Sequence, residues 1–132
     1  MPPVHIDSSS TTSPTGDPRP CVAIGHVSIA VSDIAALSEF YAAFGMRPVA
    51  DLGTLAILEL RGGTHLRLES GEPGHATLDL IVDDIADARA ALEELGACPS
   101  TVTSSGAHDR FLATDPEGNT LLVQSDHAIG PV

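Results

Sequence analysis

The segment Ile29–Pro48 has the sequence IAVSDIAALSEFYAAFGMRP, and a segment of the same outline, LIVDDIADARAALEELGACP, follows 51 residues later at Leu80–Pro99. A second pair, RGGTHLRLES at Arg61–Ser70 and PEGNTLLVQS at Pro116–Ser125, matches at an offset of 55. The chain therefore contains two copies of one supersecondary unit of about 50 residues. Two related halves predict a pseudo-two-fold domain with a shared cleft, and we expect the function to reside there.

The first repeated segment predicts a strand that leads into a helix. Apolar and polar positions alternate over residues 26–31 and 76–82, which is typical of half-buried strands. Asp33 and Asp84 are placed to cap the helices that follow, and Gly45 and Gly96 are placed to end them. The apolar positions that recur at helical spacing, and that we expect to be buried, are Ile34, Leu37, Tyr41 and Phe44 in the first copy and Ile85, Ala88, Leu92 and Leu95 in the second.

Three short strands are expected after each helix. They cover about 47–50, 54–60 and 64–70 in the first copy and about 99–103, 110–114 and 119–124 in the second. Gly62 and Gly63 predict a tight hairpin turn, and the run from Asp115 to Gly118 predicts a type I turn. The fold class is therefore α+β, with tandem βαβββ modules that form a pseudo-two-fold, half-open barrel cleft.

The domain boundaries follow from local composition. Residues 1–20 are rich in Ser, Thr and Pro and show no apolar periodicity, so we expect a disordered N-terminal tail. The single folded domain is expected to span 21–126, with module 1 at about 22–70 and module 2 at about 75–125. Residues 127–132 form a short C-terminal tail in this interpretation. A chain of 132 residues fits one domain.

Composition restricts the compartment and the partners. The formal net charge of -12 argues against binding to nucleic acid or to an anionic membrane surface. No apolar run approaches the roughly 18 residues of a membrane span, and no signal peptide is evident. Cys21 and Cys98 lie outside any C-x-x-C pattern, which indicates reduced, structural thiols in a cytoplasmic protein.

Three segments in this order resemble the vicinal oxygen chelate superfamily, also called the glyoxalase, bleomycin-resistance and extradiol dioxygenase superfamily. They are GHVSIAVSDIAALSEFYAAFGM at Gly25–Met46, LDLIVDDIADARAALEELGA at Leu78–Ala97 and FLATDPEGNTLLVQ at Phe111–Gln124. The D-P-x-G-N turn in the last segment is among the most recognisable local features of that family. The resemblance implies that each module curls its strands into a half-open barrel and that the concave faces line a cleft.

Strand alternation predicts which side chains face that cleft. In each strand the continuous apolar set packs under the helix, so the mixed set faces the concave side. His26 and His65 lie on this mixed face, as do the paired charges Arg67 and Glu69. The full predicted ligand-binding set comprises His26, Ser28, Leu55, Ile57, His65, Arg67, Glu69, Thr77, Asp79, Leu122 and Gln124.

The resemblance also implies where a divalent metal would bind. Family enzymes use one position on each of the first, fourth, fifth and eighth strands, and these positions correspond here to His26, Arg67, Thr77 and Leu122. Arg has no lone pair, Leu has no donor atom and a Thr hydroxyl is a poor ligand. Since a divalent ion needs about three good protein ligands, we expect no metal in the usual site and no other cofactor.

A relocated metal site is the alternative. Glu69 and His75 each lie two residues from a family ligand position on the same strand face. With His26 they would form a two-His-one-carboxylate set of the kind that suits Fe(II) or Zn(II). Against this set, a displacement of two residues along a strand is roughly 6 to 7 Å, which is long compared with a metal–ligand bond.

Several of these charged residues have structural explanations as well. Arg67 either compensates Glu69 or Asp79, or clamps an anionic ligand in a bidentate fork, and we favour the clamp. His108, Asp109 and Arg110 are expected to form a solvated rim in an approach loop. Asp115, Pro116 and Gly118 are attributed to the turn and not to catalysis.

Two functional classes follow, and the sequence leaves open whether the protein is an enzyme. The first is a glyoxalase/bleomycin-resistance-like protein that binds a small anionic or polar organic molecule in the inter-module cleft without the usual metal. The second is a metal-dependent lyase, isomerase or dioxygenase of the same superfamily. A domain whose cleft serves mainly dimerisation is a third possibility. Exposed strand edges need cover, so we expect a homodimer.

Overall fold

The computed structural model describes residues 16–106, 108–125 and 131. The predicted tails, 1–20 and 127–132, therefore lie mostly outside the described residues. The first module contains β1 (His26–Val31), α2 (Ile34–Phe44), β2 (Arg47–Asp51), β3 (Leu55–Glu59), a short 3₁₀ turn (Arg61–Gly63) and β4 (His65–Ser70). The second contains β5 (Thr77–Val82), α3 (Ile85–Glu94), β6 (Thr103–Ser105), β7 (His108–Thr114) and β8 (Thr120–Ser125).

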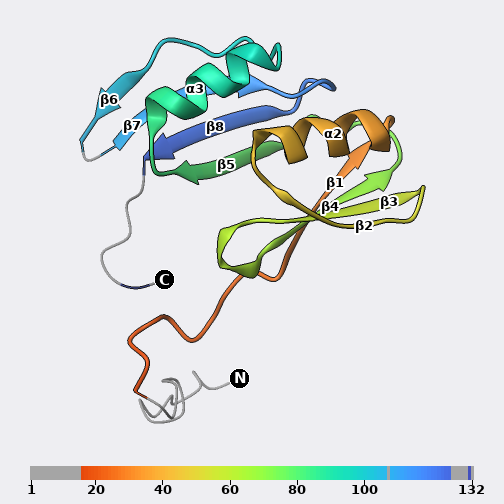
Figure 1. Cartoon of the computed structure of the whole chain (residues 1–132), viewed down its shortest axis with the longest axis horizontal. Helices are drawn as coiled ribbons and strands as arrows, with labels where there is room; N and C mark the ends of the chain where they lie inside the picture. The colour runs from red at the N-terminus through yellow and green to blue at the C-terminus, as the bar shows by residue number, and fades with distance from the viewer. Residues whose placement is uncertain (1–15, 107, 126–130, 132) are drawn as a thin grey trace, which may run out of the picture.

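Each module forms its own four-stranded mixed sheet. Sheet A has the order β1-β4-β3-β2 and sheet B has the equivalent order β5-β8-β7-β6. In both, the first and last strands of the module pair in parallel and the others pair antiparallel. The predicted α+β fold with tandem βαβββ modules is confirmed, and Figure 1 shows the two sheets side by side as open sheets that do not close into a barrel.

The helices begin and end where their capping residues predict. Asp33 accepts a hydrogen bond from the backbone of Ala36 at 3.0 Å, and Asp84 accepts one from Asp87 at 2.9 Å, so each satisfies a free N–H of the first turn. Gly45 and Gly96 follow the helices with positive φ angles of 132° and 77°. These conformations suit glycine because it lacks a Cβ.

The core lies between each helix and its sheet. Of the eight predicted helix positions, Ile34, Leu37, Tyr41, Ala88 and Leu92 are buried, while Phe44, Ile85 and Leu95 are half-buried against the core. Phe40, which the spacing did not single out, is also buried. The strands bury the continuous apolar set as predicted, for example Leu66 and Leu68 on β4. The opposite sheet faces therefore remain uncovered by helices.

Two of the predicted second-module features are wrong. Residues 99–102 form no strand, and β6 starts only at Thr103. Arg89 on α3 donates to the carbonyls of Pro99 and Ser100, at 3.0 and 2.8 Å, and so removes them from a strand ladder. Conversely, β7 starts two residues before the predicted strand at 110–114, so His108 and Asp109 belong to the strand and not to an approach loop.

Contacts between the modules lie on the helical side and at the strand ends. The Tyr41 hydroxyl on α2 donates to Asp115 at 2.6 Å, and both residues are buried. Asp115 sits in the predicted turn, where Gly118 donates to its carbonyl at 3.0 Å. Glu117 in the same turn accepts from the backbone N–H groups of Ser32 and Asp33, each at 2.7 Å. The turn that the sequence predicts as purely local therefore also joins module 2 to module 1.

No helix in the described part of the chain is both long and apolar enough to cross a membrane. Cys21 and Cys98 are free, as predicted, but both are exposed and neither contributes to the core, so the structural role predicted for them is wrong.

Candidate ligand-binding site

The helix-free face of sheet A carries three rows of side chains, which the strand register defines. His26, His65 and Glu59 form the first row across β1, β4 and β3. Ser28, Arg67 and Ile57 form the second, and Ala30, Glu69 and Leu55 form the third. All nine are exposed or half-buried, whereas the residues between them on each strand are mostly buried.

Arg67 occupies the centre of this face. Its Nη2 atom lies 3.2 Å from Oε2 of Glu69, and its side chain is 38% exposed. The Nε atom is buried and has no hydrogen-bond partner among the described residues. A buried N–H without an acceptor is uncommon in folded proteins. The side chain nevertheless remains partly exposed on the sheet face, so the ion pair with Glu69 does not enclose the guanidinium.

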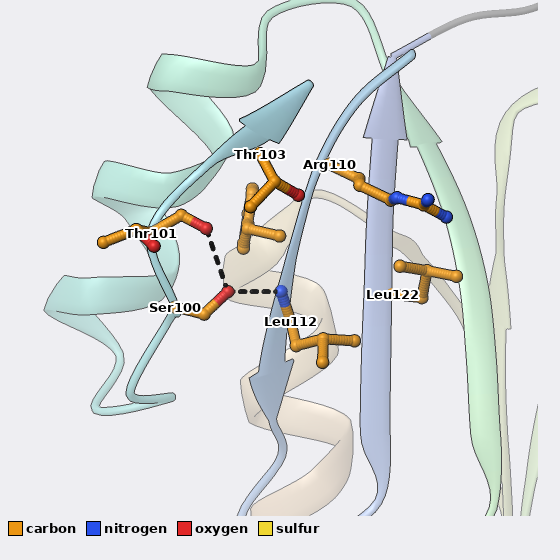
Figure 2. Close-up of a pocket in the computed structure, with 7 residues that line it drawn as sticks. Ser100, Thr101, Thr103, Arg110, Leu112 and Leu122 are labelled. Atoms are coloured by element: carbon orange, nitrogen blue, oxygen red, sulfur yellow. Dashed lines mark hydrogen bonds between the residues drawn. The ribbon is translucent and has the colours of Figure 1, made fainter. Parts of the chain in front are cut away.

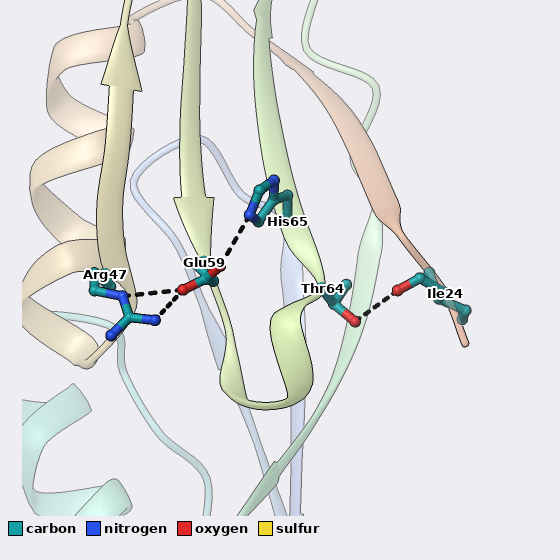
Figure 3. A network of polar contacts seen from close by, with 5 residues as sticks. All are labelled: Ile24, Arg47, Glu59, Thr64 and His65. Atoms are coloured by element: carbon teal, nitrogen blue, oxygen red, sulfur yellow. Dashed lines mark hydrogen bonds and ion pairs between the residues drawn. The ribbon is translucent and has the colours of Figure 1, made fainter. Parts of the chain in front are cut away.

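The first row belongs to a polar network at one end of sheet A, and Figure 3 shows two of its members, Glu59 and His65, together with Arg47. Nε2 of His65 lies 3.1 Å from Oε2 of Glu59, and the rings of His26 and His65 meet edge to face with centroids 5.3 Å apart. Arg47 on β2 donates through Nε to the other oxygen of Glu59 at 3.0 Å. The Arg47 guanidinium, with a smaller contribution from His65, holds the pKa of Glu59 below its ordinary value.

The corresponding face of sheet B has a different chemistry. Its rows are Thr77, Thr120 and Thr114; Asp79, Leu122 and Leu112; and Ile81, Gln124 and Arg110. The amide of Gln124 donates to Asp79 at 2.8 Å. Where sheet A places the cation Arg67 in its central row, sheet B places the apolar Leu122.

A pocket of about 400 Å³ lies on this face of sheet B. Leu112 and Leu122 line its apolar part, and the remaining lining comes from Ser100, Thr101, Thr103, Arg110 and Phe111. Figure 2 shows the Arg110 side chain crossing β8 on the side where Leu122 projects. Ser100 is held in place because its hydroxyl accepts from the backbone N–H of Leu112 at 2.9 Å.

The inter-module contacts show that His26 and His75 lie at opposite ends of the strands. Arg61, in the hairpin that precedes β4, pairs with Asp83 just after β5 at 2.9 Å, so the start of β1 adjoins the end of β5. His75 precedes β5 and lies beside Gly118, in the turn before β8. Glu117 of the same turn accepts a hydrogen bond from Ser32, directly after the end of β1. Since β5 has six residues, it separates these two ends by roughly 20 Å.

The alternative metal set is therefore not brought together. Glu69 pairs in register with Ala30, four residues along β1 from His26, which is roughly 13 Å. Across residues 16–106 and 108–125, no group of three or more His, Cys, Asp or Glu side chains is arranged to hold a metal ion. The four family positions, His26, Arg67, Thr77 and Leu122, include only one good donor. The side chains at these four positions do not fit a divalent metal.

Four residues that line the sheet B pocket were not in the ligand-binding set predicted from the sequence: Ser100, Thr103, Arg110 and Leu112. A usable signal was present, because the 55-residue offset carries Leu55 onto Arg110 and Ile57 onto Leu112. The register confirms this equivalence: Leu55 pairs with Glu69 as Arg110 pairs with Gln124. Of the predicted set, only Leu122 lines this pocket.

The family model of the glyoxalase-like domain matches residues 26–124, which include every strand and helix of both modules except the last residue of β8. The chain belongs to the glyoxalase-like domain family. The resemblance to the glyoxalase and bleomycin-resistance superfamily is thereby confirmed. None of the curated proteins matches this glyoxalase-like chain.

Three solved structures of similar fold have names that state an activity or a family. An antibiotic-binding protein, TnmS3 from Streptomyces sp. CB03234, has a TM-score of 0.72 at 23% identity, covering 80% of this chain and 97% of the other. Lactoylglutathione lyase from Agrobacterium tumefaciens has a TM-score of 0.68 at 22% identity, covering 78% and 92%. A glyoxalase/bleomycin resistance protein from Catenulispora acidiphila has a TM-score of 0.65 at 22% identity, covering 80% and 100%. These likenesses establish the fold of the glyoxalase-like domain.

Proposed function

We propose that this glyoxalase-like protein binds a small anionic or polar organic molecule on the helix-free faces of its two sheets, without the divalent metal that family enzymes use. The observation that carries the proposal is the identity of the side chain at the centre of sheet A. Arg67 replaces a metal ligand with a permanent cation. A cation at this position repels a metal ion and attracts an anion.

The geometry around Arg67 supports this proposal. Glu69 engages Nη2 of the guanidinium, while the buried Nε has no acceptor among the described residues. A carboxylate that approached the exposed part of the guanidinium would accept charge-assisted hydrogen bonds, which are strong and directional. Ser28 and Ile57 flank Arg67 in the same row and would offer one hydroxyl and one apolar contact.

The similar fold of an antibiotic-binding protein is consistent with a binding role. A lyase also shares the fold, so fold alone does not separate binding from catalysis. The side chains at the four metal-ligand positions of the family favour binding without catalysis by a metal, since only His26 among them is a good metal ligand.

The proposal includes a homodimer in the cytoplasm. β2 and β6 are the outer strands of their sheets and present unpaired backbone groups, which proteins usually cover. Val49 on β2 is half exposed, so a second copy would bury apolar surface there. The two free cysteines are consistent with a reducing compartment.

Thermal-shift measurements with a panel of small organic carboxylates, matched with their neutral amides, test the binding role. A carboxylate at about ten times its Kd stabilises the fold by about 1.4 kcal/mol, which raises Tm by several degrees. Arg67→Ala should weaken the best carboxylate by about 1.5 to 3 kcal/mol, the cost of losing a hydrogen bond to a charged group. The expected loss of binding free energy is no larger than this because the Arg67 side chain is partly exposed to solvent.

Arg19→Ala is the matched control, because Arg19 carries the same charge but lies before β1 and pairs with Asp17. Its carboxylate affinity should equal that of the wild type. If no carboxylate stabilises the protein in preference to its amide, the proposed anion binding is wrong. Equal weakening by both substitutions would show a general charge effect and would also contradict it.

A further inference from the structure

The distribution of ion pairs singles out one arginine. The chain has 18 acidic residues, and its six basic residues are all arginines. Five of them form ion pairs with Asp or Glu: Arg19, Arg47, Arg61, Arg67 and Arg89. Arg110 forms no ion pair or hydrogen bond through its side chain with any residue in 16–106 or 108–125. In so acidic a chain, a half-buried cation that has no carboxylate partner among the described residues needs another explanation.

Comparison of the two modules shows that the strand position beside this cation carries no carboxylate. The position that pairs with Arg110 on β8 is Gln124, and the equivalent position in sheet A is the carboxylate Glu69. Gln124 is neutral, and its amide donates to Asp79, the carboxylate on the same sheet face. Module 2 therefore has a cation where module 1 has Leu55, and a neutral amide where module 1 has the carboxylate Glu69.

The surroundings of Arg110 form a pocket with two chemical parts. Leu112 and Leu122 provide an apolar floor, and Leu112 is 49% exposed although it is a large apolar side chain. Thr103 pairs with Arg110 in register and, with Ser100, brings a hydroxyl to the wall. A pocket of about 400 Å³ with apolar walls and a few polar groups is of the size that holds small organic ligands.

We infer that this pocket is a second anion-binding subsite, in which Arg110 binds the carboxylate of an aromatic or aliphatic acid whose apolar body rests on Leu112 and Leu122. Arg is suited to this task because its planar fork binds a carboxylate through two parallel hydrogen bonds. Figure 2 shows the guanidinium and the two leucines on the same side of the sheet. The inference deepens the proposed function by naming the ligand class, and the subsite is independent of Arg67.

Cinnamate and its neutral amide, cinnamamide, are suitable probes. In a protein with labelled Ile and Leu methyl groups, cinnamate should shift the NMR signals of Leu112 and Leu122 saturably. The signal of Ile57, the counterpart of Leu112 on sheet A, should stay unchanged. Arg110→Ala should weaken cinnamate by roughly 10- to 100-fold, and Arg110→Lys by less, since it keeps the charge but loses the fork.

Two controls separate this inference from other effects. Arg19→Ala removes the same charge far from the pocket and should leave the affinity within about twofold, as exposed charges contribute little. Cinnamamide should bind the wild type about tenfold or more weakly, because it cannot form charge-assisted bonds. This second comparison requires no substitution, so it holds even where a variant folds poorly.

The outcomes also distinguish this inference from the proposed function. Unchanged cinnamate affinity in Arg110→Ala, or no saturable shift of the two leucines at millimolar cinnamate, overturns the subsite. Arg67-dependent stabilisation by another carboxylate would then still support the proposed function. If the leucine signals respond and Arg67→Ala has no effect on any acid in the panel, the subsite stands and the role assigned to Arg67 falls.

Discussion

Replacing Tyr41 by Phe removes one oxygen atom from the contact between the two modules. That oxygen donates to Asp115 at 2.6 Å, and both side chains are at most 5% exposed. Asp115 would keep its bonds from the backbone N–H groups of Glu117 and Asn119 and from the Asn119 amide. The change therefore costs one buried bond to a charged group, about 1.5 to 3 kcal/mol of unfolding free energy.

Urea unfolding at neutral pH measures this cost directly. Thr64→Val is the matched control, since it removes a half-buried hydroxyl that donates to a neutral carbonyl, Ile24, at 2.8 Å. We expect the control to lose only about 0.5 to 1 kcal/mol. A loss of less than about 0.5 kcal/mol in Tyr41→Phe would refute the claim that this bond stabilises the fold.

Alkaline pH offers an independent test of the same bond. Burial, reinforced by the hydrogen bond to Asp115, raises the pKa of Tyr41 above its ordinary value of 10.0. The hydroxyl then ionises in the unfolded chain before it ionises in the fold, so its contribution is complete below pH 10 and declines as the pH rises above it. The stability gap between the wild type and Tyr41→Phe should narrow above pH 10, and a constant gap would contradict the assigned cause.

Three further predictions concern the core, the polar row and the assembly. Leu92→Ala should lower the unfolding free energy by about 2 to 5 kcal/mol, whereas Leu52→Ala, at a side chain 69% exposed, should change it by less than about 0.5 kcal/mol. Because Arg47 and then His65 lower the pKa of Glu59, its stabilising contribution is present above about pH 4.5 and is lost as the pH falls through the lowered value. Melting curves of the wild type and Glu59→Gln should therefore converge in acid, and a gap that does not change with pH would exclude this role. Sedimentation velocity at micromolar concentration should show a homodimer, and a purely monomeric species would exclude one.

Much of the fold was predictable because the signals that set it are local. Period-two alternation correctly predicted that Leu66 and Leu68 are buried. The capping residues Asp33 and Asp84 correctly predicted where the two helices begin. The repeat then strengthened each assignment, because the same spacing occurs twice. Helix and strand periodicity depend on neighbouring residues and are therefore readable without tertiary contacts.

The errors in module 2 arose from contacts that no local pattern contains. Residues 99–102 fail to form a strand because Arg89, ten residues earlier on α3, binds the carbonyls of Pro99 and Ser100. The Ser100 hydroxyl then accepts from the N–H of Leu112, where a strand carbonyl would otherwise bind. The contact between Tyr41 and Asp115 likewise joins residues 74 positions apart.

The candidate site was predictable only in part, for a related reason. Strand parity identified which side chains share a face, but it does not give the register between strands. The alternative set of His26, Glu69 and His75 looked plausible on parity, whereas the pairing of His26 with His65 and of Ala30 with Glu69 separates them. Arg110 was assigned to a solvated rim and not to the ligand-binding set, because the Ser- and Gly-rich run before it predicted a loop.

The most direct test of the central claim is the metal content of the purified protein, measured by elemental analysis alongside thermal shifts with the carboxylate panel in the presence and absence of a chelator. We expect no stoichiometric zinc, iron, nickel or manganese, and a carboxylate-dependent rise in Tm that the chelator leaves unchanged. A stoichiometric metal that is lost in His26→Ala, together with binding that disappears on chelation, would rule out metal-independent binding and favour a metal-dependent enzyme.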